Sequence, residues 1–418
     1  MLATVRALGA QMEALLAGAL DKDVRRNMHT EVISSMAYGV FYACVIPFIP
    51  VVLRRSGATP EMIALYASLQ FLGSITTSLS LVLMQRRRTF NVIITCWLLA
   101  RSLFLITALV QGSVPLIALG SLYWLLEGFV IPGYTRVVQK LYPDEVRGKV
   151  MSTVRMGQVA AILLVTPLAG WALDHIGYRT LFPVASLVGI ASVLIFTRMR
   201  LDEGPLPPRQ TKALTELVQI VRSDRRFCIY LLSFALLGVG TMLSWPLYPL
   251  VQVDRLHLSY SQIGLLGLVE SCMWLISYLV WGRYLDGRGG VAVMRAVCAV
   301  SMITPLSYMI AWSGWLLIPA SLARGIVMGG FELGRINAGI QLSSRERITE
   351  YAVIQSTVVG LRGIFGPQIS VALLGAGFSD VTIFALSASV MAVAWLIFGL
   401  VNAPTPAQGN EEVQQQAS

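Results

Sequence analysis

The hydrophobic pattern of this chain is a series of long apolar runs separated by short polar segments. A membrane-spanning helix needs about 20 mostly apolar residues, and runs of that length recur along almost the whole sequence. We expect spans near residues 31–53, 62–84, 91–110, 115–138, 150–172, 181–197, 227–251, 261–284, 292–311, 315–338, 351–373 and 381–401. The pattern therefore predicts an all-α integral membrane protein with twelve transmembrane helices.

The composition supports a membrane protein and excludes several other classes. Of the 418 residues, 56% are hydrophobic and 13% are charged, and the mean hydropathy is +0.69; soluble domains have about 45–50% apolar and about 25% charged residues. The net charge of +10 comes from short basic clusters between apolar runs, so we do not expect nucleic acid as a partner. The expected partners are the lipid bilayer, a small-molecule substrate and protons, and we expect a monomer.

Positive charge is distributed unevenly between the segments that join the spans. Of the 32 lysines and arginines, few lie in the odd-numbered gaps, namely Arg54, Arg55, Arg179 and Arg255. Cytoplasmic loops carry an excess of Lys and Arg. We therefore expect a multi-pass protein of the inner membrane with both termini in the cytoplasm.

The longest internal gap divides the spans into two groups of six. We expect an N-terminal six-helix bundle at residues 29–198 and a C-terminal six-helix bundle at residues 227–402. The cytoplasmic linker between them, residues 199–226, begins with a proline-rich turn and continues with apolar residues at helical spacing from Leu214 to Val221. This spacing predicts an amphipathic helix in the linker.

The two ends of the chain are predicted to lie outside the bundles. Residues 1–28 have apolar positions near a helical period, which is typical of an amphipathic helix on the cytoplasmic membrane surface. A solvated tail is the competing interpretation of that segment. Residues 403–418 are polar and are expected to form a disordered cytoplasmic tail.

An internal repeat of about 200 residues relates the two halves of the chain. The stretches "PFIPVVL" and "PLYPLVQ" each hold two prolines three residues apart, Pro47 with Pro50 and Pro246 with Pro249. A third match pairs Pro167 in "TPLAG" with Pro367 in "GPQIS". Internal duplication is typical of many secondary transporters, and proline interrupts helical hydrogen bonding, so these prolines are candidate hinges or gates.

With twelve spans, cytoplasmic termini and two halves of six around a central loop, the chain resembles the major facilitator superfamily over nearly its whole length. The loop signature of that family, G-x-x-x-D-R-x-G-R-R, is partly matched by "GRYLDGRGG" with Gly282, Asp286 and Gly289, whereas "MQRRRTF" after the second span keeps only the basic charge. Its antiporter signature, which ends G-P-x-x-G-G, is partly matched by "TPLAGW" with Pro167 and Gly170. The resemblance implies two pseudo-symmetric six-helix bundles (the major facilitator fold), alternating access and a gating role for Asp286.

Charged residues near the middle of the spans are the candidates for chemistry. A charge at bilayer depth costs on the order of 3 kcal/mol on insertion scales, so it normally faces protein or water and marks a function or a pair. Five such residues occur: Arg101, Glu127, Glu270, Arg324 and Arg362. Four other charged residues, Glu31, Arg155, Glu332 and Arg335, are placed near cytoplasmic ends, where solvent explains them without a chemical role.

Glu127 has two interpretations. It lies at the same expected depth as Arg101, so the two form a purely structural pair in one interpretation, and a buried pair is weak evidence of function. In the other, Glu127 carries a proton that competes with substrate. Tyr123 and Trp124, one turn earlier, would then provide a face for an apolar or cationic ring.

Glu270 is the second candidate acid. Trp274 follows it by one turn, and its counterpart by the 200-residue offset is Gln70, which suggests a central cavity shared by both halves. The competing interpretation pairs Glu270 with Arg324 or Arg362. Because three central arginines face two glutamates, one guanidinium is left for a substrate carboxylate or phosphate.

These residues predict a secondary active transporter that moves a small organic molecule by alternating access. Proton-coupled export of an amphipathic compound is the main hypothesis. The alternatives are transport of an organic anion by Arg324 and Arg362, and a non-transporting scaffold or sensor on the same fold. No enzyme is expected, because no nucleophile, base and orienting group occur at a recognisable spacing. The five cysteines and three histidines are isolated from one another, so we expect neither a metal nor a cofactor.

Overall fold

The part of the chain that the structure describes is helical throughout. This computed structural model describes residues 22–71, 84, 88–200, 214–343 and 347–401, and no strand occurs among them. The helices of the N-terminal half are α2 (Lys22–Val45), α3 (Ile49–Arg55), α4 (Pro60–Leu69), α7 (Thr89–Ser102), η1 (Leu103–Ala108), α8 (Ser113–Leu141), α9 (Asp144–Ile176) and α10 (Tyr178–Phe196). Those that follow are α11 (Leu214–Ser223), α12 (Arg225–Ser244), α13 (Leu247–Leu250), η2 (Val251–Arg255), α14 (Tyr260–Ser301), α15 (Ile303–Ile310), η3 (Gly314–Leu317), α16 (Ile318–Leu342), α17 (Ile348–Gly375) and α18 (Asp380–Phe398).

Among the described residues, 10 helical segments are long and apolar enough to cross a membrane. One of them, Tyr260–Ile310, has 51 residues, or a helical length of about 77 Å at 1.5 Å per residue. That is more than twice the hydrocarbon thickness of about 30 Å, so this segment contains both the eighth and the ninth expected spans. The second expected span begins with α4 and continues into residues outside the described ones. These spans agree with the twelve-helix prediction.

Gly289, in the "GRYLDGRGG" stretch, separates the eighth span from the ninth. Its φ of 79° and ψ of 172° lie in a region that is essentially restricted to glycine. A Cβ at this position would also collide with the side chain of Gln341, whose Oε1 accepts a hydrogen bond of 3.1 Å from the Val291 amide. This conformation allows the chain to turn back between the two spans.

We expect Gly289→Ala to lower the free energy of unfolding by about 1–3 kcal/mol, the usual cost of a strained backbone conformation. Gly287→Ala is the matched control, because Gly287 lies two residues earlier and a Cβ there would meet no atom within 4 Å. Thermal unfolding of the purified variants measures the difference. Equal melting temperatures for the two variants would contradict this role of Gly289.

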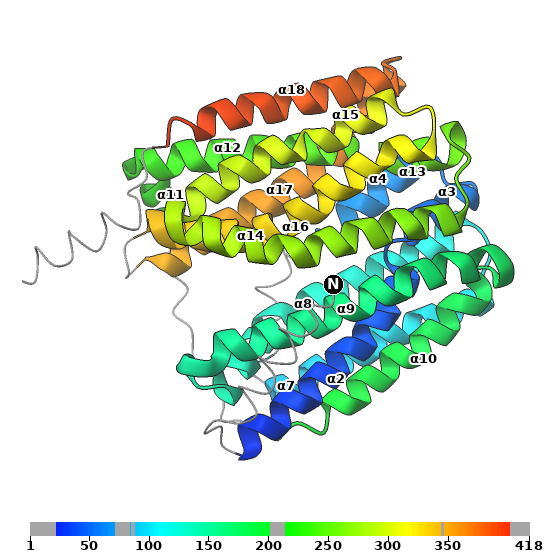
Figure 1. Cartoon of the computed structure of the whole chain (residues 1–418), viewed down its shortest axis with the longest axis horizontal. Coiled ribbons are helices and arrows are strands. Elements are labelled where there is room, and N and C mark those ends of the chain that lie inside the picture. The colour runs from blue at the N-terminus through cyan, green and yellow to red at the C-terminus, as the bar shows by residue number, and fades with distance from the viewer. Residues whose placement is uncertain (1–21, 72–83, 85–87, 201–213, 344–346, 402–418) are drawn as a thin grey trace, which may run out of the picture.

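The helices form two bundles (Figure 1). At one end of the molecule the bundles meet through α3 and α13; we call this the closed end. At the opposite end, which carries α11 and the start of α2, the ribbons of the two bundles lie apart; we call this the linker end. Helix α11 forms within the predicted linker, and its Ile220 is buried in the same apolar cluster as Phe227.

The matched prolines lie on equivalent elements in the two halves. Helical hydrogen bonding in the first span continues to Ile46, whose amide donates to the Tyr42 carbonyl at 2.9 Å, and the helix then breaks at Pro47. In the seventh span the Trp245 amide donates to Thr241 at 3.2 Å, and the helix breaks at Pro246. Pro50 and Pro249 lie inside the short helices that follow, α3 and α13.

The contacts between the halves also follow the repeat. Arg54 and Asp254 differ by 200 in sequence and form an ion pair with a distance of 2.7 Å between Nη2 and Oδ2. If a pseudo-two-fold axis relates the two halves, Arg54 and Asp254 occupy equivalent positions. Equivalent residues can touch only if both lie close to that axis. The helix pair α4 with α17 and the helix pair α9 with α14 then form the two related interfaces between the bundles.

Candidate functional site

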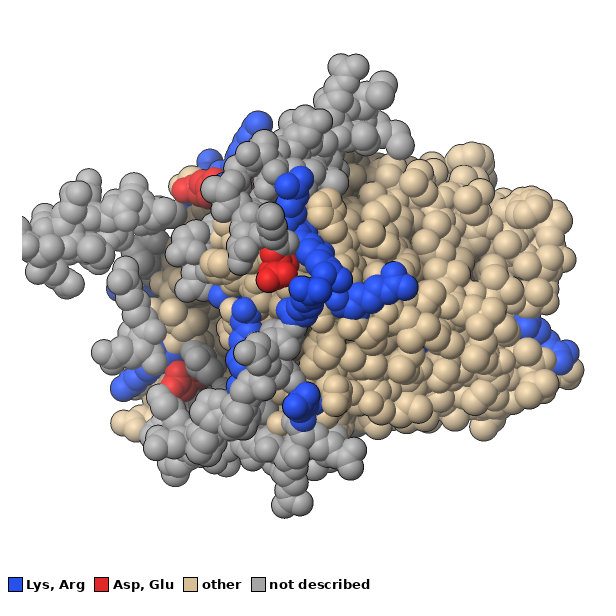
Figure 2. All heavy atoms as spheres, turned by 90° about the horizontal axis from the view of Figure 1, so that it is seen from below, with Lys and Arg blue, Asp and Glu red and all other residues tan. Residues whose placement is uncertain are grey.

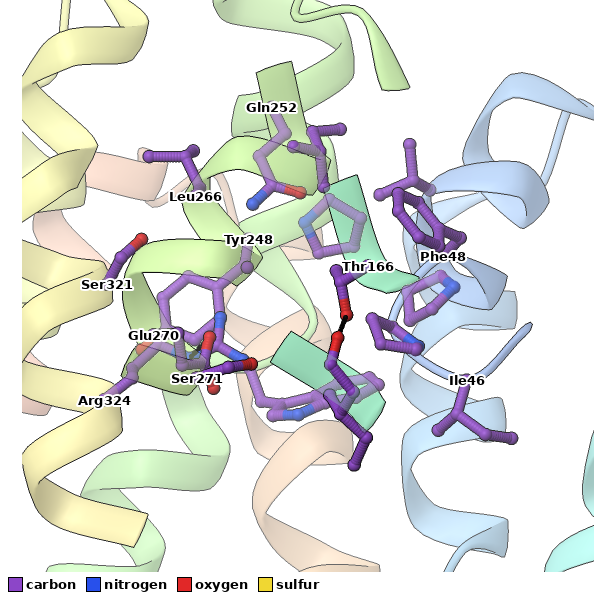
Figure 3. Close-up of a pocket in the computed structure, with 18 of the residues that line it drawn as sticks. Ile46, Phe48, Thr166, Tyr248, Gln252, Leu266, Glu270, Ser271, Ser321 and Arg324 are labelled. Carbon is purple, nitrogen blue, oxygen red and sulfur yellow. Dashed lines mark hydrogen bonds and ion pairs between the residues drawn. The ribbon is translucent and has the colours of Figure 1, made fainter. Parts of the chain in front are cut away.

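A cavity of about 360 Å³ lies between the two halves, and both contribute residues to its wall. The N-terminal half supplies residues of α2, α3, α4, α8 and α9, and the C-terminal half supplies residues of α13, η2, α14, α15 and α16. The helix breaks at Pro47 and Pro246 place Tyr42 and Phe48 on one side of the cavity and Trp245 and Tyr248 on the other. Figure 3 shows the side chains that converge there.

An ion pair between Glu270 and Arg324 forms the charged part of the cavity wall (Figure 3). Arg324 Nε lies 3.3 Å from Glu270 Oε2, and the side chains are 41% and 19% exposed, respectively. Gly325 explains how the pair forms, because a Cβ there would collide with backbone atoms of Glu270 and Trp274. The glycine allows α16 to approach the backbone of α14, which brings Arg324 next to Glu270.

Aromatic side chains from both halves cover much of the remaining wall. On the N-terminal side, Trp124 Nε1 donates a hydrogen bond of 3.1 Å to the Tyr66 hydroxyl. On the C-terminal side, the Tyr248 ring lies 4.4 Å from that of Tyr308, centroid to centroid. These tryptophans and tyrosines combine apolar faces with polar tips, so the cavity suits a ring system with a polar group.

At the closed end the halves are joined by polar contacts to helix α14. Asp174 of α9 accepts hydrogen bonds from the Tyr260 amide at 2.9 Å and the Ser261 amide at 2.7 Å. A carboxylate at a helix N-terminus compensates free amides and the helix dipole. Arg55 donates to the Leu258 carbonyl and lies over the Tyr260 ring at 3.8 Å. These contacts join the N-terminal half to the start of α14 at the closed end.

On the linker side of the cavity the halves are bridged by longer side chains. Arg155 Nε of α9 lies 3.6 Å from Glu332 Oε1 of α16, and the two side chains are 42% and 39% exposed. The Tyr278 hydroxyl donates to Glu332 Oε2 at 2.5 Å and accepts from Trp274 Nε1 at 3.0 Å. These side chains join α9 of the N-terminal half to α14 and α16 of the C-terminal half.

The structure brings together five of the eight predicted binding residues. Gln70, Trp124, Glu270, Trp274 and Arg324 all line the cavity. Of the predicted hinge prolines, Pro47, Pro50 and Pro249 line it as well, and Pro246 is at the adjacent helix break.

Tyr123 and Glu127 lie elsewhere in the N-terminal half. Tyr123 is buried in an aromatic cluster with Phe41 and Phe104, and its hydroxyl is 2.9 Å from that of Tyr38. Glu127 is not among the cavity-lining residues. Its Oε1 is enclosed without a hydrogen-bond partner.

The proposed Arg101–Glu127 ion pair does not form. No ion pair within 4.0 Å joins Glu127 to any residue that the structure describes. Arg101 turns instead toward α10, where its Nη1 donates to Ser192 Oγ at 2.5 Å, and its guanidinium lies over the Tyr38 ring at 4.5 Å. Arg101 is therefore satisfied within the bundle.

Arg362 also lies away from the cavity. Its Nη1 donates a hydrogen bond of 2.6 Å to the Phe234 carbonyl, and the guanidinium lies over the Phe234 ring at 4.3 Å. A Cβ on Gly238 would collide with the Arg362 side chain, so this glycine makes room for it. Arg324 lines the cavity and Arg362 does not, so a joint role of the two arginines in binding substrate remains a prediction.

The remaining gating candidates occupy different places. Pro167 lies inside α9, where a Cβ on Gly264 would come 3.2 Å from its Cα, so it is part of the interface between the halves. Pro367 lies inside α17. Asp286 is exposed near the linker end of α14 and forms no ion pair with another described residue. Their gating roles remain predictions.

Several residues at this site were missed by the sequence reasoning. Tyr42, Tyr66 and Tyr248 line the cavity, but nothing in the sequence distinguishes them from the other aromatic residues of the apolar spans. Arg155 and Glu332 were assigned to solvent, although they join the two halves. Their only available signal was that opposite charges occur at similar depths in spans of different halves. Across the described residues, no three His, Cys, Asp or Glu side chains are close enough to hold a metal ion.

Comparison with known proteins agrees with this architecture. The family model described as Major Facilitator Superfamily matches residues 32–367. The chain is 24% identical over 300 residues to the multidrug resistance protein MdtG of Salmonella arizonae and also of Salmonella typhi, with 68% of this chain and 73% of the relative covered.

Two solved structures share the fold. The nucleoside transporter NupG (D323A mutant) superposes with a TM-score of 0.69 at 12% identity, covering 90% of this chain and 100% of NupG. A bacterial homologue of the human lysosomal transporter Spinster, in an inward-facing and occupied conformation, gives a TM-score of 0.64 at 12% identity, covering 92% and 97%.

Proposed function

This chain belongs to the major facilitator superfamily, and from that premise we propose that it is a secondary transporter that exports an amphipathic organic compound in exchange for protons. The observation that carries the proposal is the aromatic cavity between the two halves, with one ion pair in its wall. The similarity to MdtG, which is named a multidrug resistance protein, supports export as the direction. Alternating access would expose this cavity to each side in turn.

We further propose that the linker end faces the cytoplasm. Figure 2 shows Lys and Arg gathered toward that end, beside a wide surface of residues that are neither acidic nor basic. Positive residues stay on the cytoplasmic side of a membrane. Because α3 and α13 meet at the closed end, whereas the ribbons of the two bundles lie apart at the linker end, the conformation would be inward-facing.

Transport of an organic anion is the second candidate function. Arg324 supports it, since 41% of its side chain is exposed and guanidinium groups bind carboxylates and phosphates well. A scaffold or sensor is the third candidate. A scaffold would have its central charges paired and its centre packed shut; here Glu270 and Arg324 are paired, but the cavity is present.

The test has two stages. A thermal-shift screen of cationic, anionic, neutral and zwitterionic aromatic compounds identifies ligands, because a compound that binds only the folded state raises apparent stability. The best ligand is then offered to proteoliposomes with a pH gradient, with and without a protonophore. We expect movement against the concentration gradient that the protonophore abolishes. A ligand that stabilises the protein strongly but is never moved would favour the sensor instead.

A further inference from the structure

The charges in the cavity wall sum to zero and come from one half. Among the described residues that line the cavity, Glu270 and Arg324 are the charged ones, and both belong to the C-terminal half. The facing wall of the N-terminal half presents aromatic and uncharged polar groups, such as Tyr66, Gln70 and Trp124. A ligand therefore meets a neutral ion pair on one side and rings on the other.

The groups around this pair add no net charge to it. Its titratable neighbours include three uncharged tyrosines: Tyr42 of α2, Tyr248 of α13 and Tyr308 of α15. Arg155 of α9 also acts on this region, but it is paired across the halves with Glu332 of α16 at 3.6 Å. Both ion pairs near the cavity are thus self-compensated.

The two members of the pair differ in how they can respond to a ligand. An arginine keeps its proton in proteins, whereas a carboxylate can accept one. The pair involves Nε of Arg324, and a guanidinium has five N–H donors, so further donors remain for an anionic group. A cation that bound Glu270 would leave Arg324 without its counter-charge, and an uncompensated charge near the middle of the bilayer is unfavourable.

We propose that this pair restricts the cavity to ligands that bring no net charge, counted together with any proton that binds with them. An aromatic zwitterion meets this rule directly, with its carboxylate on Arg324 and its ammonium group on Glu270. An aromatic monoanion meets it when one proton from solution binds the Glu270 carboxylate. A monocation has no such route and is excluded. This inference rests on the proposed function, since it names the substrate class of the same cavity.

Three naphthyl compounds that differ mainly in charge provide the test. They are 3-(1-naphthyl)alanine (a zwitterion), 1-naphthaleneacetate (an anion) and 1-naphthylmethylammonium (a cation). Isothermal titration calorimetry of the full-length protein at pH 5.5 and pH 7.5, in two buffers of different ionisation enthalpy, gives the affinity and the number of protons taken up.

We expect the zwitterion to bind with the same affinity at both pH values. The anion should bind more tightly at pH 5.5, with about one proton taken up, and two pH units allow a change of up to about 100-fold for one linked proton. The cation should bind at least about tenfold more weakly than the zwitterion at either pH, because it leaves a charge uncompensated.

Two variants separate charge from shape. In Glu270→Gln the anion should bind independently of pH, since no carboxylate is left to take up the proton. In the double variant with Glu270→Gln and Arg324→Gln, the pair is replaced by two neutral side chains, and the affinities of the three compounds should agree within about threefold. The single variant leaves Arg324 unpaired and could unfold for that reason, and thermal unfolding would reveal this. The double variant removes both charges, so it still tests the charge rule in that case.

Cation binding to the wild-type protein that equals zwitterion binding would overturn the charge rule. Failure of both the zwitterion and the anion to bind at millimolar concentration would overturn it too. These results are distinct from failure of the proposed function, in which compounds bind as expected but a pH gradient moves none of them across proteoliposomes.

Discussion

Gly170→Leu should reduce turnover in proteoliposomes by at least about tenfold while the protein remains folded. Gly170 lies at a close approach between the backbones of the two halves: a Cβ at this position would overlap the Tyr260 carbonyl and come 3.2 Å from the Gly264 Cα. Both neighbours are backbone atoms, so no side chain can rotate away. The added side chain can be accommodated only if α9 and α14 separate.

The size of this effect follows from the cost of overpacking. Inserting extra methylene groups into a packed interior typically costs about 1–3 kcal/mol. At the interface between the two bundles, this cost destabilises the conformation in which the closed end is closed. A change of about 1–3 kcal/mol shifts the equilibrium between the open and closed conformations by about 5–150-fold. The variant should therefore accumulate with its closed end open.

Hydrogen exchange provides the structural measurement for this variant. The Tyr260 and Ser261 amides donate to Asp174 across the interface, so their exchange should become faster when the halves separate. Gly148→Leu is the matched control on the same helix, because a Cβ there would meet nothing within 4 Å. Loss of transport in both variants, or unchanged exchange at Tyr260 in Gly170→Leu, would count against this role of the interface.

The spans and the repeat could be predicted because they depend on local properties of the sequence. A run of about twenty apolar residues is long enough to span a bilayer whatever its neighbours, and a proline removes a helical hydrogen bond whatever surrounds it. The breaks at Pro47 and Pro246 and the related elements around them are therefore confirmed. The pairing of Glu270 with Arg324 was one of two predicted partners, and the depth of each residue was enough to suggest it.

The placement of Glu127, Tyr123 and Arg362 could not be predicted, because it depends on how each helix is rotated about its axis. A shift of one residue turns a side chain by about 100°, which decides between the cavity and the interior of a bundle. Arg101 illustrates the same limit: Ser192 of α10 provides a hydrogen-bond partner that no spacing rule relates to Arg101. Contacts between the halves, such as Arg155 with Glu332, depend on the packing of the two bundles.

Glu127→Gln should abolish pH-driven accumulation of the screened ligand while leaving its binding within about twofold of the wild-type value. Glu127 forms no ion pair within the described part of the chain, and its Oε1 is enclosed without a hydrogen bond. A proton can therefore bind and leave Glu127 without breaking an ion pair of the described residues, unlike at Glu270. Glutamine keeps the shape of the side chain but cannot release a proton.

The assay compares accumulation under a pH gradient with downhill exchange at equal pH. Driven accumulation should fall by at least about tenfold in Glu127→Gln, in the range that loss of one proton-transfer group typically produces, and exchange should persist. Glu61→Gln is the control, since Glu61 is an exposed glutamate in the first turn of α4 and should retain driven transport. Normal proton coupling in Glu127→Gln would exclude Glu127 as the carrier.

If Glu127 carries the exchanged proton, the proton binds in the N-terminal half, whereas the charged residues that contact the ligand belong to the C-terminal half. Trp124 lies three residues before Glu127 on α8, lines the cavity and donates to Tyr66. A change in the charge of Glu127 would then reach the ligand through the position of α8, with no contact between proton and ligand. While a zwitterion is bound, Glu270 and Arg324 keep their charges on the opposite wall, so a proton gradient would act on the transporter through the N-terminal half.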